Sequence, residues 1–199
     1  SLALLKKRLG PQAIQQLLQP DLEASDSYWQ ETAARSNGQL RPAETRLSVR
    51  GLTTNDFMTW FATISKADEA AMLAAHPEHY HIGTNREGGM VVVETLGRHV
   101  SHLEIAHSQD NKSSELVTGR DDSSTFIMTG KGYTRDGTNT GEVLHQFKDH
   151  EDGGGFDVSL GIWFPAACED ELLEGHRQNL AVEFRNWLVA AYEELKTKE

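Results

Sequence analysis

Two ionisable residues interrupt the apolar face of the helix predicted at the end of the chain, from about Glu169 to Lys196. At about 100° per residue, one face of this helix collects Leu173, Leu180, Phe184, Trp187 and Ala191. His176 and Glu183 lie within that face, seven residues apart. A carboxylate that points into a core is costly unless it is paired, protonated or bound to a metal ion. Two interpretations stay open: Glu183 turns outward to pair with Arg86 or Arg98 while His176 is an ordinary core histidine, or both residues belong to a site.

A second carboxylate and a group of histidines lie in predicted strands. Alternation along Met90–Leu96 places Glu94 on the more apolar face of that strand, where it is the polar exception. In the strand that begins at His79, the same rule places His79 and His81 on one side and Tyr80 on the other. Neutral imidazoles together with carboxylates suit Zn²⁺. Taken singly, each residue is as well explained by a position at the surface or at a strand end.

The composition predicts one acidic globular domain. The 199 residues are enough for a single domain with a sizeable core, and the net charge of −11 is expected to repel phosphate groups. We therefore expect neither nucleic acid nor an anionic membrane as a partner. No apolar run approaches the roughly 20 residues of a membrane helix, and the first residues lack the pattern of a signal peptide. Cys168, the single cysteine, excludes an internal disulfide framework and favours a cytoplasmic location; we expect it to pack rather than to react.

The order of the predicted elements indicates an α+β protein. Residues 1–19 are predicted as an amphipathic helix that stops at Pro20, within a helical N-terminal extension covering residues 1–43. This extension is expected to dock on the body of the protein or on a second copy of the chain in a homodimer. Residues 44–199 are predicted as one domain, with a strand from Thr45, two helices, six strands and the long final helix. The six strands are predicted at His79–Gly83, Met90–Leu96, His99–His107, Thr125–Thr134, Glu142–Asp149 and Phe156–Phe164.

This order resembles the helix-grip fold of the START and Bet v 1-like superfamily. In that fold a curved antiparallel sheet wraps around the C-terminal helix, and the cavity between them is a usual place for a small molecule. The fold alone does not identify the molecule. The sequence contains no G-x-S-x-G elbow, P-loop, dinucleotide glycine fingerprint or H-E-x-x-H motif. Serine hydrolases, NTPases and ordinary zincins are therefore disfavoured.

Short segments between Leu52 and Tyr192 resemble the diacetylphloroglucinol hydrolase and phloretin hydrolase family. These zinc-dependent enzymes of helix-grip fold cleave the carbon–carbon bond between an acyl group and a phenolic ring. The segments are Leu52-Thr53 with Trp60-Phe61-Ala62, Pro77-Glu78-His79-Tyr80, Val93-Glu94-Thr95-Leu96-Gly97, Leu144-His145-Gln146-Phe147 and Glu183-Phe184-Arg185-Asn186. The resemblance implies that His79, Glu94 and Glu183 bind zinc and that His145 is an active-site histidine.

One position departs from the family pattern. The family carries a zinc-binding histidine four residues before its last glutamate, and this chain has Asn179 there. An amide is a much poorer zinc ligand than an imidazole. His176 is one turn earlier on the same face and is the expected replacement, although its Cα would lie roughly 10.5 Å along the axis from that of Glu183. The loop between His79 and Glu94 is also shorter than the family's.

Three functions are compatible with these residues. The first is a hydrolase that holds Zn²⁺ on His79, Glu94, His176 and Glu183, with His145 supplying a proton, and that acts on an acylated phenol or a polyketide-derived ketone. The second is a metal-free protein that binds or carries a hydrophobic ligand, with the same residues as an internal hydrogen-bond network. The third is a polyketide cyclase-like or dehydratase-like enzyme that uses acid–base pairs without metal.

Overall fold

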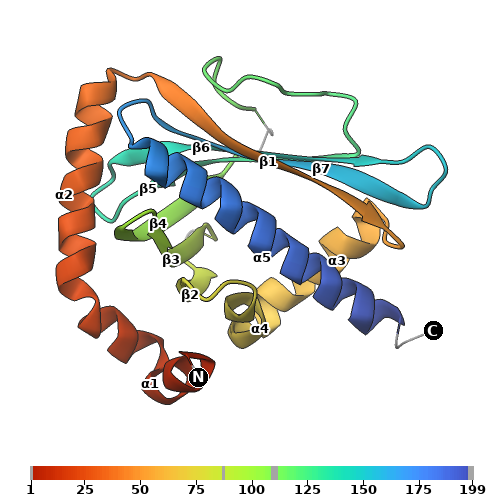
Figure 1. Cartoon of the computed structure of the whole chain (residues 1–199), viewed down its shortest axis with the longest axis horizontal. Coiled ribbons are helices and arrows are strands. Elements are labelled where there is room, and N and C mark those ends of the chain that lie inside the picture. Colours follow the sequence, from red (N-terminus) through yellow and green to blue (C-terminus); the bar gives the residue numbers. More distant parts are fainter. Residues whose placement is uncertain (1, 87, 109–111, 197–199) are drawn as a thin grey trace.

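One curved antiparallel sheet wrapped around a long helix organises the protein. The computed structural model describes residues 2–86, 88–108 and 112–196. Its 7-stranded sheet has the order β1-β7-β6-β5-β4-β3-β2, so that β1 and β2 are the edges. Helix α5 crosses the concave side of the sheet, and α3 and α4 lie beside its C-terminal half (Figure 1). The α+β helix-grip fold predicted from the order of the elements is therefore confirmed.

The observed elements differ from the predicted ones mainly at their ends. The strands are β1 (Leu40–Arg50), β2 (His79–Thr84), β3 (Met90–Leu96), β4 (His99–His107), β5 (Phe126–Tyr133), β6 (Asn139–Asp149) and β7 (Gly155–Pro165). The helices are α1 (Leu2–Leu17), α2 (Gln19–Ser36), α3 (Thr54–Ala67), α4 (Glu69–Ala74) and α5 (Asp170–Lys196). The first strand begins at Leu40 rather than at the predicted Thr45, inside the segment taken as an extension.

The N-terminal region is more helical than the sequence pattern predicts. Pro20 does not end helical structure but lies in the first turn of α2, where the missing backbone N–H of proline leaves no hydrogen bond unmade. The break lies earlier, at Gly10, whose φ of 73° and ψ of 162° kink α1. Trp29, on α2, is fully buried against β4, and its indole N–H donates to Ser101 Oγ at 3.0 Å. Helix α2 thus packs closely on the sheet.

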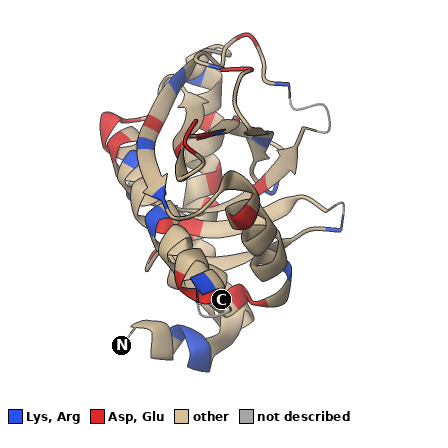
Figure 2. Ribbon diagram, turned by 90° about the vertical axis from the view of Figure 1, so that its right-hand side faces the viewer, with Lys and Arg blue, Asp and Glu red and all other residues tan. Residues whose placement is uncertain are grey.

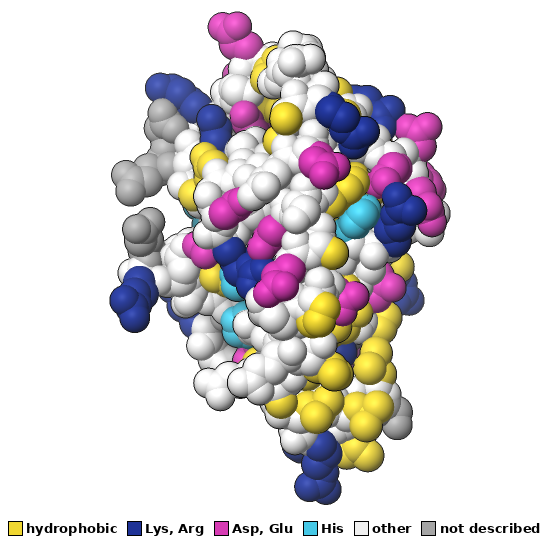
Figure 3. Space-filling view, turned by 90° about the vertical axis from the view of Figure 1, so that its left-hand side faces the viewer, with side chains coloured by type: hydrophobic (Ala, Val, Ile, Leu, Met, Phe, Trp, Pro, Cys, Tyr) yellow, Lys and Arg dark blue, Asp and Glu magenta, His cyan; other side chains and the backbone are white. Residues whose placement is uncertain are grey.

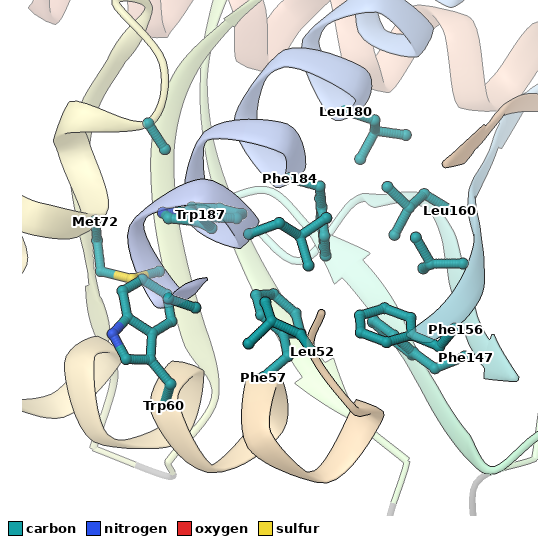
Figure 4. Packing of buried hydrophobic residues seen from close by; sticks show 14 of the residues in the cluster. Leu52, Phe57, Trp60, Met72, Phe147, Phe156, Leu160, Leu180, Phe184 and Trp187 are labelled. Atoms are coloured by element: carbon teal, nitrogen blue, oxygen red, sulfur yellow. The ribbon is translucent and has the colours of Figure 1, made fainter. Parts of the chain in front are cut away.

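The main hydrophobic core fills the space between α3, α5 and the sheet. The capping box predicted from Thr53 and Asp56 is present and starts α3. Figure 4 shows aromatic and aliphatic side chains from these elements meeting in one cluster, including Phe57, Trp60, Phe147, Phe156, Phe184 and Trp187. This packing fixes the C-terminal half of α5 against the strands, and with it the residues that α5 turns toward the sheet.

Acidic and basic residues are spread over several elements. Figure 2 shows acidic positions on helices and loops with basic positions between them. Most of the ion pairs are at the surface, such as Arg50 with Asp152 and Arg177 with Glu174. Exposed pairs of this kind contribute little to stability. In the described part of the chain, the helices are too short or too polar to cross a membrane.

Candidate metal centre and cavity

A small cavity between α5 and the sheet brings the predicted site residues together. Its volume is about 90 Å³. All five residues predicted from the sequence contribute to its wall: His79, Glu94, His145, His176 and Glu183. Each of them is buried, with at most 7% of its surface exposed. The rest of the wall is mostly apolar and includes Phe61, Met72, Ile82, Val92, Leu180, Phe184 and Trp187.

Three of these residues form a close cluster. His79 begins β2, Glu94 lies opposite it on β3, and Glu183 reaches them from α5. His79 Nε2 is 2.9 Å from Glu183 Oε2 and 3.7 Å from Glu94 Oε2. One donor atom from each residue lies within 4.8 Å of the others, and among the described residues no other His, Cys, Asp or Glu side chains form such a group. The prediction that they converge is confirmed.

A β-bulge separates His79 from His81. His79 pairs with Glu94 across the ladder, but His81 pairs with Val93 and Ile82 with Val92, so that one extra residue is inserted into β2. The insertion reverses the alternation, and Ile82 rather than His81 joins His79 in the cavity wall. His81 instead contacts Glu69 of α4 through its Nδ1. The prediction that His79 and His81 share one side of the strand was therefore wrong.

Burial and the two neighbouring carboxylates shift the titration of the cluster. Burial raises the pKa of Glu94 to about 7 and outweighs the attraction of His79. Burial alone would lower the pKa of His79, but the hydrogen bond to Glu183 and the two negative charges outweigh it and raise that pKa. The pKa of Glu183 is lowered, because the bond to His79 and the charge of that imidazole outweigh the effect of burial. His79 and Glu183 thus each favour the charged form of the other.

Two further predicted histidines lie in the wall, which also includes His107 of β4. Burial lowers the pKa of both His145 and His176 to about 4, so both are neutral at pH 7. His145 Nδ1 accepts a hydrogen bond from the Gly161 backbone N–H at 3.3 Å, which leaves the proton of the neutral ring on Nε2. His176 Nδ1 is buried and has no hydrogen-bond partner in the described residues. His176 lies outside the close cluster of His79, Glu94 and Glu183.

Asn179 and Arg98 have other partners. Asn179 Nδ2 donates to the backbone oxygen of Thr95 at 3.4 Å, and Asn179 is not part of the cavity wall. Arg98 pairs with Glu169 at 2.7 Å, so the interpretation that Arg98 holds Glu183 at the surface is wrong. Glu183 is turned inward and bonded to His79.

The donor set of the cluster fits a divalent metal ion. One imidazole and two carboxylates are ligands that Zn²⁺ accepts, at about 2.0–2.2 Å from each donor. Donor atoms within 4.8 Å of one another need to move only slightly to reach that distance. The unpartnered Nδ1 of His176 adds a neutral imidazole in the same wall. Whether the cluster and His176 bind metal stays a prediction.

A larger hollow, of about 580 Å³, lies between α1 and α4. Figure 3 shows hydrophobic side chains gathered at this end of the molecule, where α1 exposes Leu2, Leu4, Leu5, Leu9 and Leu17. As far as the chain is described, its wall includes none of the five predicted site residues. We take the smaller cavity as the candidate site, because the buried titratable groups meet there.

Sequence reasoning missed two polar groups of the cavity, the imidazole of His107 and the indole of Trp187. Trp187 was assigned only to the apolar face of the final helix, but its indole Nε1 is buried without a partner among the described residues. The sequence does predict its place beside the site, since Trp187 follows Glu183 by four residues and so lies on the same face of the helix. The sequence could not predict that its N–H lacks an acceptor, because this depends on which groups the neighbouring strands and helices place beside the indole.

Comparison with one of two similar solved structures supports the fold. The crystal structure of Ara h 8.0201, a Bet v 1 family allergen, has a TM-score of 0.50 and 11% identity, over 77% of this chain and 99% of that chain. A putative uncharacterized protein from Rhizobium leguminosarum has a TM-score of 0.38 and 12% identity, over 78% and 98%. No family model and no curated protein matches the sequence. The resemblance to the carbon–carbon hydrolases therefore rests on the short sequence segments alone.

Proposed function

We propose that this protein binds a divalent metal ion, Zn²⁺ by preference, on His79, Glu94 and Glu183, and that it acts on a small carbonyl compound in the cavity. The observation that carries the proposal is the buried convergence of three donor atoms within 4.8 Å in the wall of the cavity. Three buried ionisable groups are costly to bring together, and an ion with water would satisfy all of them. His176 is proposed as a fourth ligand from the same wall.

The resemblance noted in the sequence suggests hydrolysis of the bond between an acyl group and a phenolic ring. Water adds hydroxide to the acyl carbon to give a carboxylic acid, and the departing ring carbon takes a proton. A bound Zn²⁺ would polarise the carbonyl group or lower the pKa of a bound water molecule. His145 is neutral, so we propose it as a relay in the cavity wall that takes up the proton released by the attacking water and passes it to the departing ring carbon. The apolar wall excludes bulk water from the ring.

The size of the cavity restricts the ligand. At about 90 Å³ it is smaller than the roughly 300–1,000 Å³ usual for drug-sized ligands. We therefore expect a compact molecule with one ring rather than an extended polyketide. A larger substrate would require the walls formed by α3 and α4 to move outward.

Metal stoichiometry is the direct test of the proposed centre. We expect about one Zn²⁺ per chain after loading and dialysis, measured by elemental analysis. His79→Ala, Glu94→Gln and Glu183→Gln should each lower occupancy at least about tenfold at limiting metal, because each removes one of few ligands. Glu142→Gln is the matched control: Glu142 is also buried, but it lies outside the cavity wall and accepts from the Ser114 backbone N–H. Wild-type protein without metal, or equal loss in Glu142→Gln, would reject the proposed centre.

A metal-free ligand-binding protein is the second candidate. It is favoured by the Bet v 1-like fold, which is often a ligand-binding or carrier fold. It is also favoured by the balance of charges, since the bond between His79 and Glu183 and the raised pKa of Glu94 reduce the negative charge that an ion would have to neutralise. In this case a small apolar ligand should bind with unchanged affinity in the presence of a chelator. An acid–base enzyme without metal would differ from it by turning over the ligand under the same conditions.

A further inference from the structure

The indole N–H of Trp187 is a hydrogen-bond donor without an acceptor. Trp187 is 6% exposed, and its Nε1 has no partner among the residues that the structure describes. Indole nitrogen only donates, so no rotation or tautomer of the ring can satisfy it in another way. A buried N–H group left unpaired is unfavourable, and such groups are rare in folded proteins. An acceptor from outside the chain is therefore expected at this atom.

The ring of Trp187 is held in place by its neighbours. It stacks against the His79 ring, with centroids 6.1 Å apart and planes at 25°. Phe61 and Phe184 contact it edge to face, with centroids at 5.1 and 5.3 Å. Figure 4 shows the ring nitrogen on the side away from Phe184. Because three rings fix the indole, the direction of its N–H bond is also fixed.

The position of this donor links it to the candidate site. Trp187 is one turn after Glu183 on α5, and both residues belong to the wall of the same cavity. The other Trp residue on the same side of the core, Trp60, is different, because its Nε1 donates to Glu194 Oε2 at 2.7 Å. Of these two indoles in one core cluster, the one without a partner among the described residues is the one that lines the cavity.

We propose that the Nε1–H of Trp187 donates a hydrogen bond to an oxygen atom of the bound ligand, so that the cavity selects compact apolar molecules carrying a carbonyl or phenolic oxygen. The inference rests on the proposed function only in requiring that the cavity binds a small molecule; it does not require a metal ion. A site with a buried donor discriminates against an isostere that lacks the acceptor, because the donor is then left unpaired in the complex.

Binding of two matched probes to two proteins tests this role. Acetophenone and ethylbenzene have nearly the same shape and differ in the carbonyl oxygen, and Trp187→Phe keeps an aromatic ring but removes the N–H. We expect the wild-type affinity ratio of acetophenone to ethylbenzene to fall by about fivefold or more in Trp187→Phe. Calorimetry is run with chelator and again with Zn²⁺, so that a metal–carbonyl contact is separated from the indole contact. Trp60→Phe, which removes an N–H outside the cavity wall, should leave the ratio unchanged.

A spectroscopic measurement on wild-type protein makes the test independent of the stability of the variant. The chain has four Trp residues, so four indole ¹⁵N–¹H signals are expected. Acetophenone should shift one of them downfield, and ethylbenzene should not. The proposal is overturned if no indole signal responds to acetophenone, or if the affinity ratio is the same in wild type and Trp187→Phe. If wild type binds neither acetophenone nor ethylbenzene, both this inference and the proposal that the cavity binds a small molecule are rejected. If wild type binds the two compounds with equal affinity, only this inference is rejected.

Discussion

Glu94 lies directly opposite His79 in the ladder between β2 and β3, and their side chains approach to 3.7 Å on the cavity side. The next pairing along the ladder joins His81 to Val93, because a bulge inserts one residue after His79. One irregularity in an edge strand thus keeps a single histidine of the pair beside two carboxylates. The other histidine lies outside the cavity wall and contacts Glu69 of α4.

His81→Ala should leave metal binding unchanged. The bulge removes His81 from the cavity wall, and its contact with Glu69 is partly exposed, so its loss should cost less than about 1 kcal/mol of unfolding free energy. His79→Ala, two positions away, should abolish the same binding. Zinc competition with a colorimetric chelator distinguishes the two variants. Comparable loss of affinity in both would mean that the register of β2 in solution differs from the one described.

His176 and Asn179 should contribute unequally to the metal centre. His176 is a neutral imidazole in the cavity wall with an unpartnered nitrogen, whereas Asn179 is bonded to the Thr95 backbone outside that wall. We expect His176→Ala to weaken zinc affinity by about 10–100-fold and Asn179→Ala by less than about threefold. Metal content of the two variants at equal free zinc provides the measurement. Equal occupancy in both would leave a site of His79, Glu94 and Glu183 only.

Glu94 should stabilise the metal-free protein less as the pH rises through neutrality. Burial raises the pKa of Glu94 from 4.5 to about 7. A group whose pKa is higher in the folded state stabilises folding below its unfolded pKa, and this contribution is lost as the pH rises through the folded value. The buried His145 and His176, whose pKa is lowered to about 4, act in the opposite direction, but they are present in both wild type and Glu94→Gln. We therefore expect the unfolding free energy of wild type relative to Glu94→Gln to fall by about 1–3 kcal/mol between about pH 5 and about pH 8 in the presence of chelator.

Urea unfolding at several pH values, with Glu94→Gln as the comparison, checks this dependence. The amide cannot ionise, so the difference between the two profiles isolates the titration of Glu94. Added zinc should offset the loss in wild type, since the metal binds the deprotonated carboxylate and its affinity rises with pH. An identical profile for wild type and Glu94→Gln would show that Glu94 does not titrate near neutrality.

Trp29→Ala should destabilise the whole domain. Trp29 has 0% of its surface exposed, donates to Ser101 on β4 and stacks on Phe164 with centroids 5.9 Å apart. Truncation of a buried aromatic residue of this kind costs about 3–5 kcal/mol. Exposed Glu31, on the same helix, is the control, and Glu31→Ala should change the unfolding free energy by less than about 0.5 kcal/mol. A small effect of Trp29→Ala would mean that α2 is only loosely attached to the sheet.

The sequence by itself determined the periodic part of this protein. The 3.6-residue period of the last helix placed His176 and Glu183 on the buried face, and the two-residue alternation of β3 placed Glu94 inward. In both patterns, the position of a residue within a regular helix or strand decides whether its side chain faces the core or the solvent. The order of the elements then implied a sheet around the last helix, and so a meeting place for His79, Glu94 and Glu183.

Only the tertiary structure decided the irregularities within the helices and strands and the contacts between distant elements. The bulge after His79 depends on the pairing of β2 with β3, and helix α2, which includes Pro20, is held on β4 by the packing of Trp29. The His79–Glu183 bond and the unpartnered indole of Trp187 depend on which groups face one another across the cavity. These are relations between residues far apart in the chain. Local propensity does not encode them, because their free energy comes from register, packing and burial that exist only after the sheet has closed around α5.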